Sequence, residues 1–253
     1  MKKINNFILI IFILMISNIN VFADSGFEAI IDMPIGASFT IPIGKPNIDV
    51  YGDNFSIKRG DVIGKINASA GVAVKLGYLF NIYDDMGISA LAEIGYHYNS
   101  YTSIMRIEGE GFDLSDTLTK NVRTHSIKIG LFPKFNKGNF SFGLGFGVKI
   151  PLLAIFSTEY AYLNATEVGE TYSKNQKIEN FNFEDIKNSK VIPVIPYIKL
   201  TADYSFFFVD NIAFNLGVHI NYDFGLQQKD SNFREDAIEF GFQLGLRFAP
   251  KLE

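Results

Sequence analysis

Apolar and polar residues alternate with a period of two over long stretches of this chain. In residues 212–224, one parity consists of Ile212, Phe214, Leu216, Val218, Ile220, Tyr222 and Phe224. The other parity carries small, polar or charged residues. The segments 140–150 and 240–248 alternate in the same way. A strict period of two is typical of a β-strand with one apolar and one polar face, so we predict a strand in each segment.

Five further segments alternate less regularly: 26–42, 65–80, 88–101, 119–135 and 191–208. Pro193 and Pro196 fit the last segment poorly, because proline donates no ladder hydrogen bond and favours strand ends. Short connections rich in Asp, Asn and Gly take turns with long polar ones, which are 44–61, 106–118, 158–190 and 228–234. This order predicts an all-β fold, an eight-stranded antiparallel up-and-down transmembrane β-barrel.

The start of the chain has the three regions of a secretory signal peptide. Lys2 and Lys3 precede the apolar run 7–16, and a short polar stretch leads to Ala23. The run is too short for a membrane-spanning helix, which needs about 20 apolar residues, and this argues against an N-terminal anchor. We expect residues 1–23 to be a signal peptide cleaved after Ala23, and 24–253 to form one barrel domain.

The apolar face of the predicted barrel must lie outside. A secreted eight-stranded barrel could instead be a soluble ligand carrier with its apolar face inside, but such a lumen holds only side chains or one small ligand. The predicted strands offer more large apolar residues than that space admits, whereas the opposite parity is rich in Gly, Ser, Ala and Asn. Aromatic residues also gather near the segment ends, as an interfacial girdle would require. We therefore expect the apolar face to contact lipid.

The last strand carries a local pattern of its own, a polar residue followed by glycine and alternating apolar residues. The pattern consists of Glu239, Gly241, Leu244, Leu246 and Phe248. With this motif, residues 26–248 resemble the small outer-membrane β-barrel family of the OmpA/OmpX type. The resemblance implies a Gram-negative-type outer membrane, periplasmic termini, long loops at the cell surface and an insertion signal read by the barrel-assembly machinery. Family members commonly end on that aromatic residue, whereas here the chain continues to Glu253.

The polar parity places charged residues inside the barrel. The acids are Glu28, Asp32, Glu93, Asp203, Asp223 and Glu239, and the bases are Lys65, Lys75, Lys128, Lys149, Lys199 and Arg247. Buried charges need partners, so these acids and bases should neutralise one another in the lumen. The expected result is a closed polar network that holds the strands in register. An ion path, and with it a small diffusion channel, is the alternative interpretation.

The histidines raise the alternative of an outer-membrane lipid-modifying enzyme, of the lipid A deacylase or acyltransferase type. His125 precedes Ser126, but neighbouring strand residues point to opposite faces, so they cannot form a nucleophile–base pair. His97 and His219 share the inward parity with Glu93 and Asp223. We interpret His97 and His219 as hydrogen-bonded members of the interior network.

The amino-acid composition excludes or disfavours several classes of function. The chain has no cysteine, which excludes disulfides and thiol chemistry, and its net charge of -4 argues against nucleic-acid binding. We expect no metal, no cofactor and no enzymatic activity. The membrane lipid and the assembly machinery are expected partners, and the polar loop 158–190 is the candidate contact with an extracellular ligand. The middle of that loop, 167–180, is expected to be mobile and open to proteases.

Overall fold

The structure is a computed structural model. It describes residues 25–44, 57–83, 85–109, 115–166, 169–188, 192–227 and 233–252. The predicted signal peptide and its cleavage site lie outside the described residues. Among the described residues, no helix is both long and apolar enough to cross a membrane.

Ten antiparallel strands and one short helix, α2, make up the described chain. Their bounds are β1 Gly26–Ile43, β2 Ile57–Gly64, β3 Ile66–Tyr83, β4 Met86–Gly109, β5 Ser115–Lys137, β6 Phe140–Thr166, β7 Gly169–Asn182, α2 Phe183–Asn188, β8 Ile195–Val209, β9 Ile212–Gln227 and β10 Arg234–Phe248. Pairing runs β1–β3–β4–β5–β6–β8–β9–β10 and returns to β1, which closes an eight-stranded barrel. The predicted fold is therefore confirmed.

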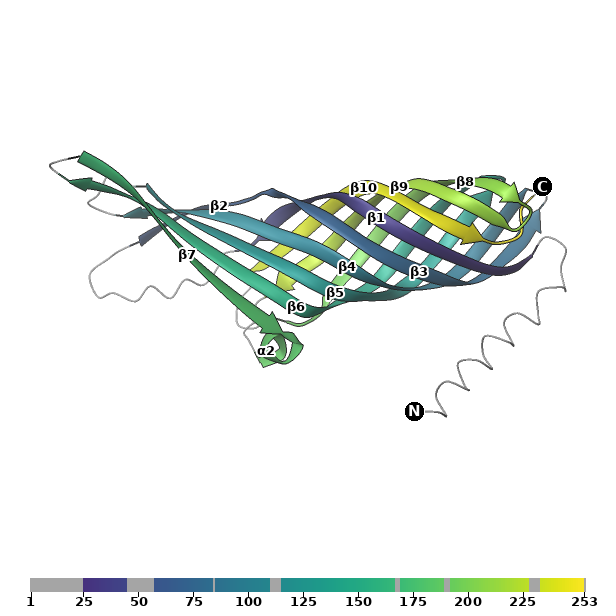
Figure 1. Cartoon of the computed structure of the whole chain (residues 1–253), viewed down its shortest axis with the longest axis horizontal. Helices are drawn as coiled ribbons and strands as arrows, with labels where there is room; N and C mark the ends of the chain where they lie inside the picture. The colour runs from purple at the N-terminus through teal and green to yellow at the C-terminus, as the bar shows by residue number, and fades with distance from the viewer. Residues whose placement is uncertain are drawn as a thin grey trace.

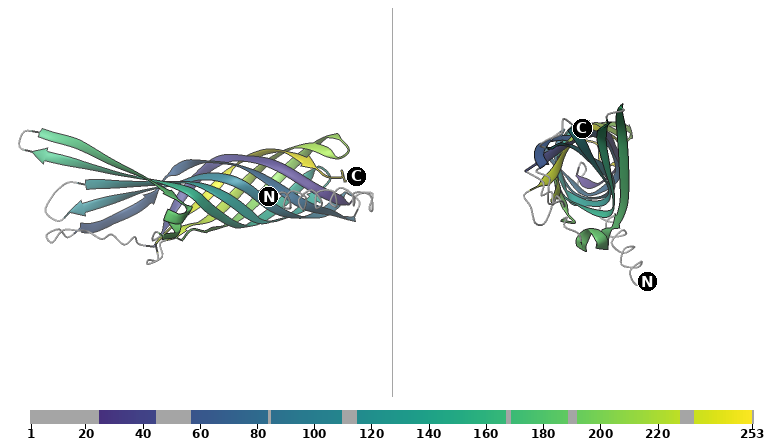
Figure 2. Two further views of the ribbon diagram at one scale, coloured as in Figure 1. Left: turned by 60° about the horizontal axis from the view of Figure 1, so that its bottom comes forward. Right: turned by 90° about the vertical axis from the view of Figure 1, so that its left-hand side faces the viewer.

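The two ends of the barrel differ in length and in construction. The short turns after β3, β5 and β8 gather at one end, where β10 also finishes (Figure 1). At the other end β4, β5 and β6 continue far beyond the ring, and β2 and β7 join them as additional strands (Figures 1 and 2). The view along the axis shows the closed ring from the long-strand end (Figure 2, right).

Large apolar side chains cover the outside of the ring. On β10 and β9 these exposed residues are Phe240, Phe242, Leu244, Leu246, Phe214, Leu216, Val218 and Ile220. The same holds for Ile31, Met33 and Ile35 on β1. A soluble protein rarely exposes so continuous an apolar surface, whereas a transmembrane barrel turns it toward lipid. The chain is an integral outer-membrane β-barrel with its apolar parity facing the bilayer.

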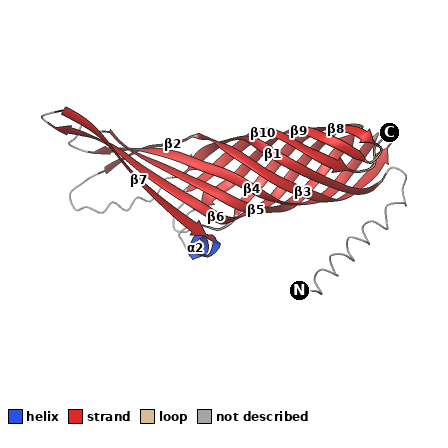
Figure 3. Ribbon diagram, viewed as in Figure 1, coloured by secondary structure: helices blue, strands red, loops and turns tan. Residues whose placement is uncertain are grey.

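The long connections are where the structure departs most from the sequence-based expectation. The predicted loop 158–190 instead contains the end of β6, all of β7 and the helix α2. Figure 3 draws the two strands in red and the helix in blue. Likewise most of 106–118 belongs to β4 and β5, and 57–64 forms β2. Residues 169–180 of the segment expected to be mobile belong to β7, which pairs with β6 from Leu153↔Asn182 to Thr166↔Gly169, and residues 167–168 lie outside the described residues. Backbone pairing supplies the order that side-chain patterning did not reveal.

The start of the predicted segment 191–208 also needs correction. β8 begins at Ile195, not at residue 191, and Pro193 lies outside it. Pro196 is the second residue of the strand and pairs with Val148 at the upper end of the β6–β8 ladder. Both positions agree with the confinement of proline to strand ends.

Candidate functional site

The interior of the barrel holds the polar network that the sequence predicts as the candidate site. All of the following predicted members are buried: Glu28, Asp32, Lys75, Glu93, His97, Lys128, Lys149, Lys199, Asp203, His219, Asp223, Glu239 and Arg247. Lys65 is the exception, because it lies exposed at the break between β2 and β3. Lys134 on β5, which we did not single out, is buried in the lumen instead.

The layer of the lumen nearest the short-turn end is built around Glu28. Arg247 Nε donates a hydrogen bond of 2.8 Å to Glu28 Oε1, and the Lys134 ammonium lies 3.6 Å from the same oxygen. Ser89 donates to the other carboxylate oxygen. The Arg247 guanidinium also reaches Asn136 Oδ1 at 3.1 Å. Strands β1, β4, β5 and β10 are thereby joined across the barrel.

The next layer combines an ion pair with an aromatic ring. Lys75 pairs with Asp32, and its ammonium lies 4.0 Å from the centroid of the Phe132 ring. Phe132 is fully buried and packs onto a stripe of glycine on β6, where a Cβ at Gly143 or Gly145 would come within 2.4 or 2.7 Å of the ring. The glycines therefore leave the space that the Phe132 ring fills.

Two further groups occupy the middle of the lumen. Glu93 pairs with Lys128 at 3.0 Å and accepts a hydrogen bond of 2.7 Å from the Tyr197 hydroxyl. Lys199 donates to Gln243 Oε1 at 2.9 Å, and Gln243 donates onward to Asp203. Each charge is thus compensated by an opposite charge or a chain of hydrogen bonds, as burial requires.

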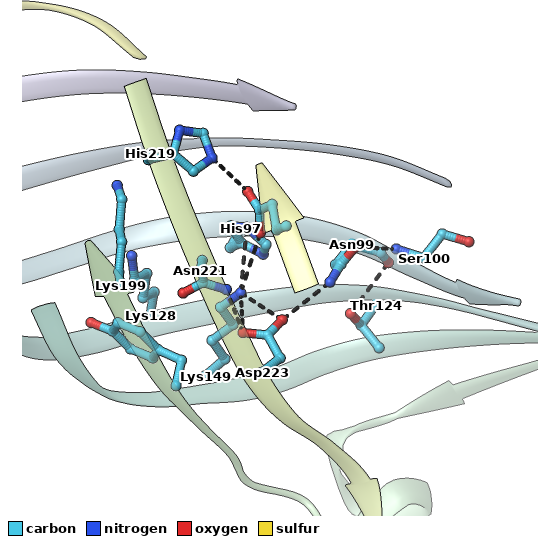
Figure 4. Close-up of polar contacts among 12 residues, drawn as sticks. His97, Asn99, Ser100, Thr124, Lys128, Lys149, Lys199, His219, Asn221 and Asp223 are labelled. Carbon is cyan, nitrogen blue, oxygen red and sulfur yellow. Dashed lines mark hydrogen bonds and ion pairs between the residues drawn. The ribbon is translucent and has the colours of Figure 1, made fainter. Parts of the chain in front are cut away.

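The two lumenal histidines share one carboxylate. His97 Nε2 and His219 Nε2 each lie 3.1 Å from a different oxygen of Glu239 (Figure 4). The Nδ1 atoms of both rings are buried without a hydrogen-bond partner in the described structure. The Lys149 ammonium lies 3.5 Å from His97 Nε2 and 3.8 Å from Glu239. Glu239 therefore joins β4, β6 and β9 to β10.

Asp223 is the second acidic centre of this upper layer. Lys149 pairs with it at 2.8 Å, and Asn99 donates to it at 3.1 Å (Figure 4). The Tyr101 hydroxyl also donates to Asp223 at 3.1 Å. Tyr101 is at the end of the predicted segment 88–101, where an aromatic residue is expected in the interfacial girdle, but it is fully buried inside the barrel. Its odd number in β4 places it on the same face as Glu93 and His97, so the alternation could have assigned it correctly.

An apolar layer lies above the charges at the long-strand end. It consists of Tyr101, Val122, Ala154, Ile186, Ile195 and Ala237, with Phe156 and Phe181 packed against it. Ile186 comes from α2, which begins with a reciprocal capping pair: Asn182 Oδ1 accepts from the Asp185 N–H, and Asp185 accepts from the Asn182 N–H, both at 3.0 Å. The helix therefore contributes an apolar side chain to the top of the lumen.

This arrangement has the chemistry of a closed scaffold. Large side chains such as Phe132, Tyr197, Arg247 and Tyr101 are buried in the lumen, and opposite charges neutralise one another across it. Among the described residues, no group of histidine and acidic side chains is arranged to hold a metal ion. His125 lies on the outer wall, with Nδ1 2.6 Å from the Tyr96 hydroxyl, whereas Ser126 is buried inside.

The alternation of the sequence could also have found several members that we missed. Lys134 has the same parity in β5 as Lys128, and Gln243 has the same parity in β10 as Glu239 and Arg247. Tyr197 has the parity of Lys199 in β8. The predicted network included none of the three, although the alternation places all of them on the inner face.

The residues of the predicted insertion motif divide between the two faces of β10. Leu244, Leu246 and Phe248 lie on the lipid-facing wall, and Glu239 lies in the lumen. After Phe248 the chain turns under the barrel, where Ala249 N–H bonds to Asn211 at 3.0 Å and Leu252 is buried. The tail thus lies against the short-turn end instead of extending the strand.

No protein-family model matches the chain, and no curated protein sequence matches it. Among solved structures, Ail, the attachment invasion locus protein of Yersinia pestis, is 12% identical with a TM-score of 0.33; the match covers 88% of this chain and 99% of Ail. OprG from Pseudomonas aeruginosa is 10% identical with a TM-score of 0.33, over 89% and 97% of the two chains. Neisserial surface protein A is 10% identical with a TM-score of 0.30, over 89% and 98%.

Proposed function

We propose that this protein is a non-enzymatic surface protein of the small OmpA/OmpX-type barrel family. It is exported by a signal peptide cleaved after Ala23, inserted through the motif on β10, and oriented with its long-strand end outside the cell. The barrel is a sealed anchor, and the strands that project from it bind an extracellular polypeptide. The observation that carries this proposal is a projecting sheet with two unpaired edges.

The projecting sheet has the strand order β2–β4–β5–β6–β7. Its ladders reach Ile57↔Gly109 between β2 and β4, Glu108↔Ser115 between β4 and β5, and Thr166↔Gly169 between β6 and β7. Within the described residues β2 pairs only with β4, and β7 only with β6. Each outer strand therefore presents a row of backbone N–H and C=O groups, which can receive another strand.

The sheet is held rigidly enough to serve as a binding surface. β4, β5 and β6 are continuous from the barrel wall into the projection. The return strand β7 leads directly into α2, and Ile186 of α2 is buried in the apolar layer of the mouth. A pre-ordered edge costs less conformational entropy on binding than a disordered loop would.

The exposed side chains of β7 are mostly polar, which favours a polar partner strand at this edge. Residues 175–180 are exposed, and Lys177 pairs with Glu179 at 2.9 Å on the surface. Charges on an edge strand discourage uncontrolled aggregation, yet they leave the backbone groups available to a matching strand. Ile178, which is 56% exposed, offers the apolar contact that a partner side chain would cover.

A displayed library of random peptides tests the proposal. The full-length protein in lipid nanodiscs is compared with a variant in which 160–177 is replaced by a short Gly-Ser turn, so that the barrel strands remain. Enrichment of extended peptides by the full-length protein, and a reduced enrichment by the shortened variant, which keeps only the β2 edge, would support binding at the β7 edge. Equal enrichment by both proteins would refute binding at the β7 edge. Retained heat-modifiable mobility on gels confirms that the shortened variant is folded.

A further inference from the structure

Along the outer face of β4 and β5, the side chains change from apolar to polar toward the long-strand end. On β5 the exposed apolar positions Phe135, Leu131 and Ile129 continue to Ile127. The stretch 127–135 matches the roughly 9–11 residues of one tilted membrane crossing. The next outward-facing residues are His125 and then Arg123. These two side chains therefore lie where the hydrocarbon ends and the lipid head groups begin.

Two tyrosine side chains, Tyr96 and Tyr98, contact His125 on this outer wall. It pairs across the ladder with Tyr98, and their ring centroids lie 5.3 Å apart. Its Nδ1 lies 2.6 Å from the hydroxyl of Tyr96, which is 44% exposed. Within the described residues His125 forms no further hydrogen bond, so Nε2 is available to a group outside the protein.

Arg123 lies two residues farther along the same face. It pairs across the ladders with Ser100 and Ile155, neither of which is charged. Its Nε is buried without a hydrogen-bond partner, and within the described residues Arg123 forms no ion pair. Among the described residues, the Arg123 guanidinium therefore has no anionic partner.

The position and the donors together indicate which ligand chemistry this surface could bind. The Arg123 guanidinium can bind phosphate in a bidentate geometry. When the Tyr96 hydroxyl donates to His125 Nδ1, the imidazole carries its proton on Nε2, which can then donate to the same ligand. The ring of Tyr96 and the side chain of Ile127 form the next outward-facing ladder pair on the membrane side of His125, so the ligand has an apolar part as well. We propose that Arg123, His125 and Tyr96 form an external binding site for the phosphate group of an outer-leaflet lipid.

The proposal rests on the outward orientation of the long-strand end, which a separate labelling experiment tests. The binding experiment uses the full-length protein in phosphatidylcholine nanodiscs containing diphosphoryl lipid A, with dephosphorylated lipid A as the second arm. Native mass spectrometry measures the bound lipid. Arg123→Gln should weaken binding of the phosphorylated lipid by about tenfold, because one charge-assisted contact is lost. Arg123→Lys should lose less, and no variant should alter binding of the dephosphorylated lipid.

Lys137→Gln is the matched control. It removes one positive charge from the outer face of the same strand, but at the short-turn end. An equal loss in Lys137→Gln and Arg123→Gln would show general attraction between charges and would overturn the proposal. Equal binding of the two lipid A forms would overturn it too. Displacement of the lipid by inorganic phosphate alone would mean that free phosphate is the occupant. Unchanged gel mobility verifies that each variant is folded.

Discussion

Arg247 and Glu28 join the last strand of the barrel to the first. The Arg247 guanidinium donates to the Glu28 carboxylate at 2.8 Å across a sequence separation of 219 residues, and both side chains are buried. The backbone ladder between β1 and β10 closes the ring at the same level, where Ile30 pairs with Arg247. Closure of the barrel is thus specified by a side-chain contact as well as by main-chain hydrogen bonds.

Removing the charge of Glu28 should strongly destabilise the barrel. Glu28→Gln leaves Arg247 and Lys134 buried without their anion, and breaking a buried pair costs about 3–5 kcal/mol. Urea unfolding from lipid vesicles measures the change in the free energy of unfolding. Glu179→Gln breaks the exposed pair with Lys177 and should cost at most about 1 kcal/mol. Similar losses in both variants would show that burial does not govern the Glu28 pair.

The sequence predicts the barrel well because the bilayer imposes a rule on every crossing strand. One face must be apolar and the other must fit the lumen, so a period of two recurs wherever a strand meets lipid. This reason also explains why residues far apart in the sequence, such as Glu28 and Glu239, are both buried in the lumen. The rule needs an unbroken strand, and Lys65 was misplaced because the chain breaks there between β2 and β3.

Beyond the membrane the same rule no longer applies. The end of β6 and all of β7 lie in the projection, where neither face contacts lipid, so their residues show no apolar parity. Backbone pairing holds these strands, and hydrogen bonding of the main chain leaves little trace in the sequence. The Asn182 and Asp185 capping pair was a local sign of α2, but a helix of six residues gives no apolar period to find.

Leu244 provides a test of the lipid-facing wall. It is 38% exposed and lies between Met33 on β1 and Leu216 on β9 in the ladders. Leu244→Arg should reduce the free energy of folding into lipid vesicles by about 2–4 kcal/mol, because the charge enters the hydrocarbon. Ile178→Arg makes the same change on the projecting sheet and should have little effect. If vesicles tolerated both changes equally, the wall would not contact lipid.

The filled lumen should not conduct ions. Phe132 and Tyr197 lie across it, and the paired charges leave no uncompensated site for a permeating ion. Purified protein inserted into planar bilayers should therefore give no steady current, with insertion verified by protease protection of the same preparation. A steady single-channel conductance would contradict the closed scaffold and restore the diffusion channel.

The histidines should be dispensable for lipid chemistry. His97 and His219 contact Glu239 inside the lumen, where they hold strands together. A His97→Ala/His219→Ala double variant should leave the lipid A profile of the host unchanged while lowering the stability of the barrel. Mass spectrometry of extracted lipid A, compared with cells lacking the protein, measures the first effect. A product that appears with the wild type and disappears with the double variant would establish a lipid-modifying enzyme.

Two variants, each with one introduced cysteine, can establish the orientation of the barrel in the membrane. The chain contains none, so each introduced cysteine gives an unambiguous signal. Ile178 is exposed on the projecting sheet, and Asp210 is exposed in the short turn between β8 and β9 at the opposite end. Long extensions belong outside and short turns in the periplasm. A membrane-impermeant maleimide should therefore label Ile178→Cys on intact cells, and Asp210→Cys only after the outer membrane is permeabilised. The reverse pattern would invert the topology, and with it both the surface role of the projecting sheet and the outer-leaflet position of Arg123.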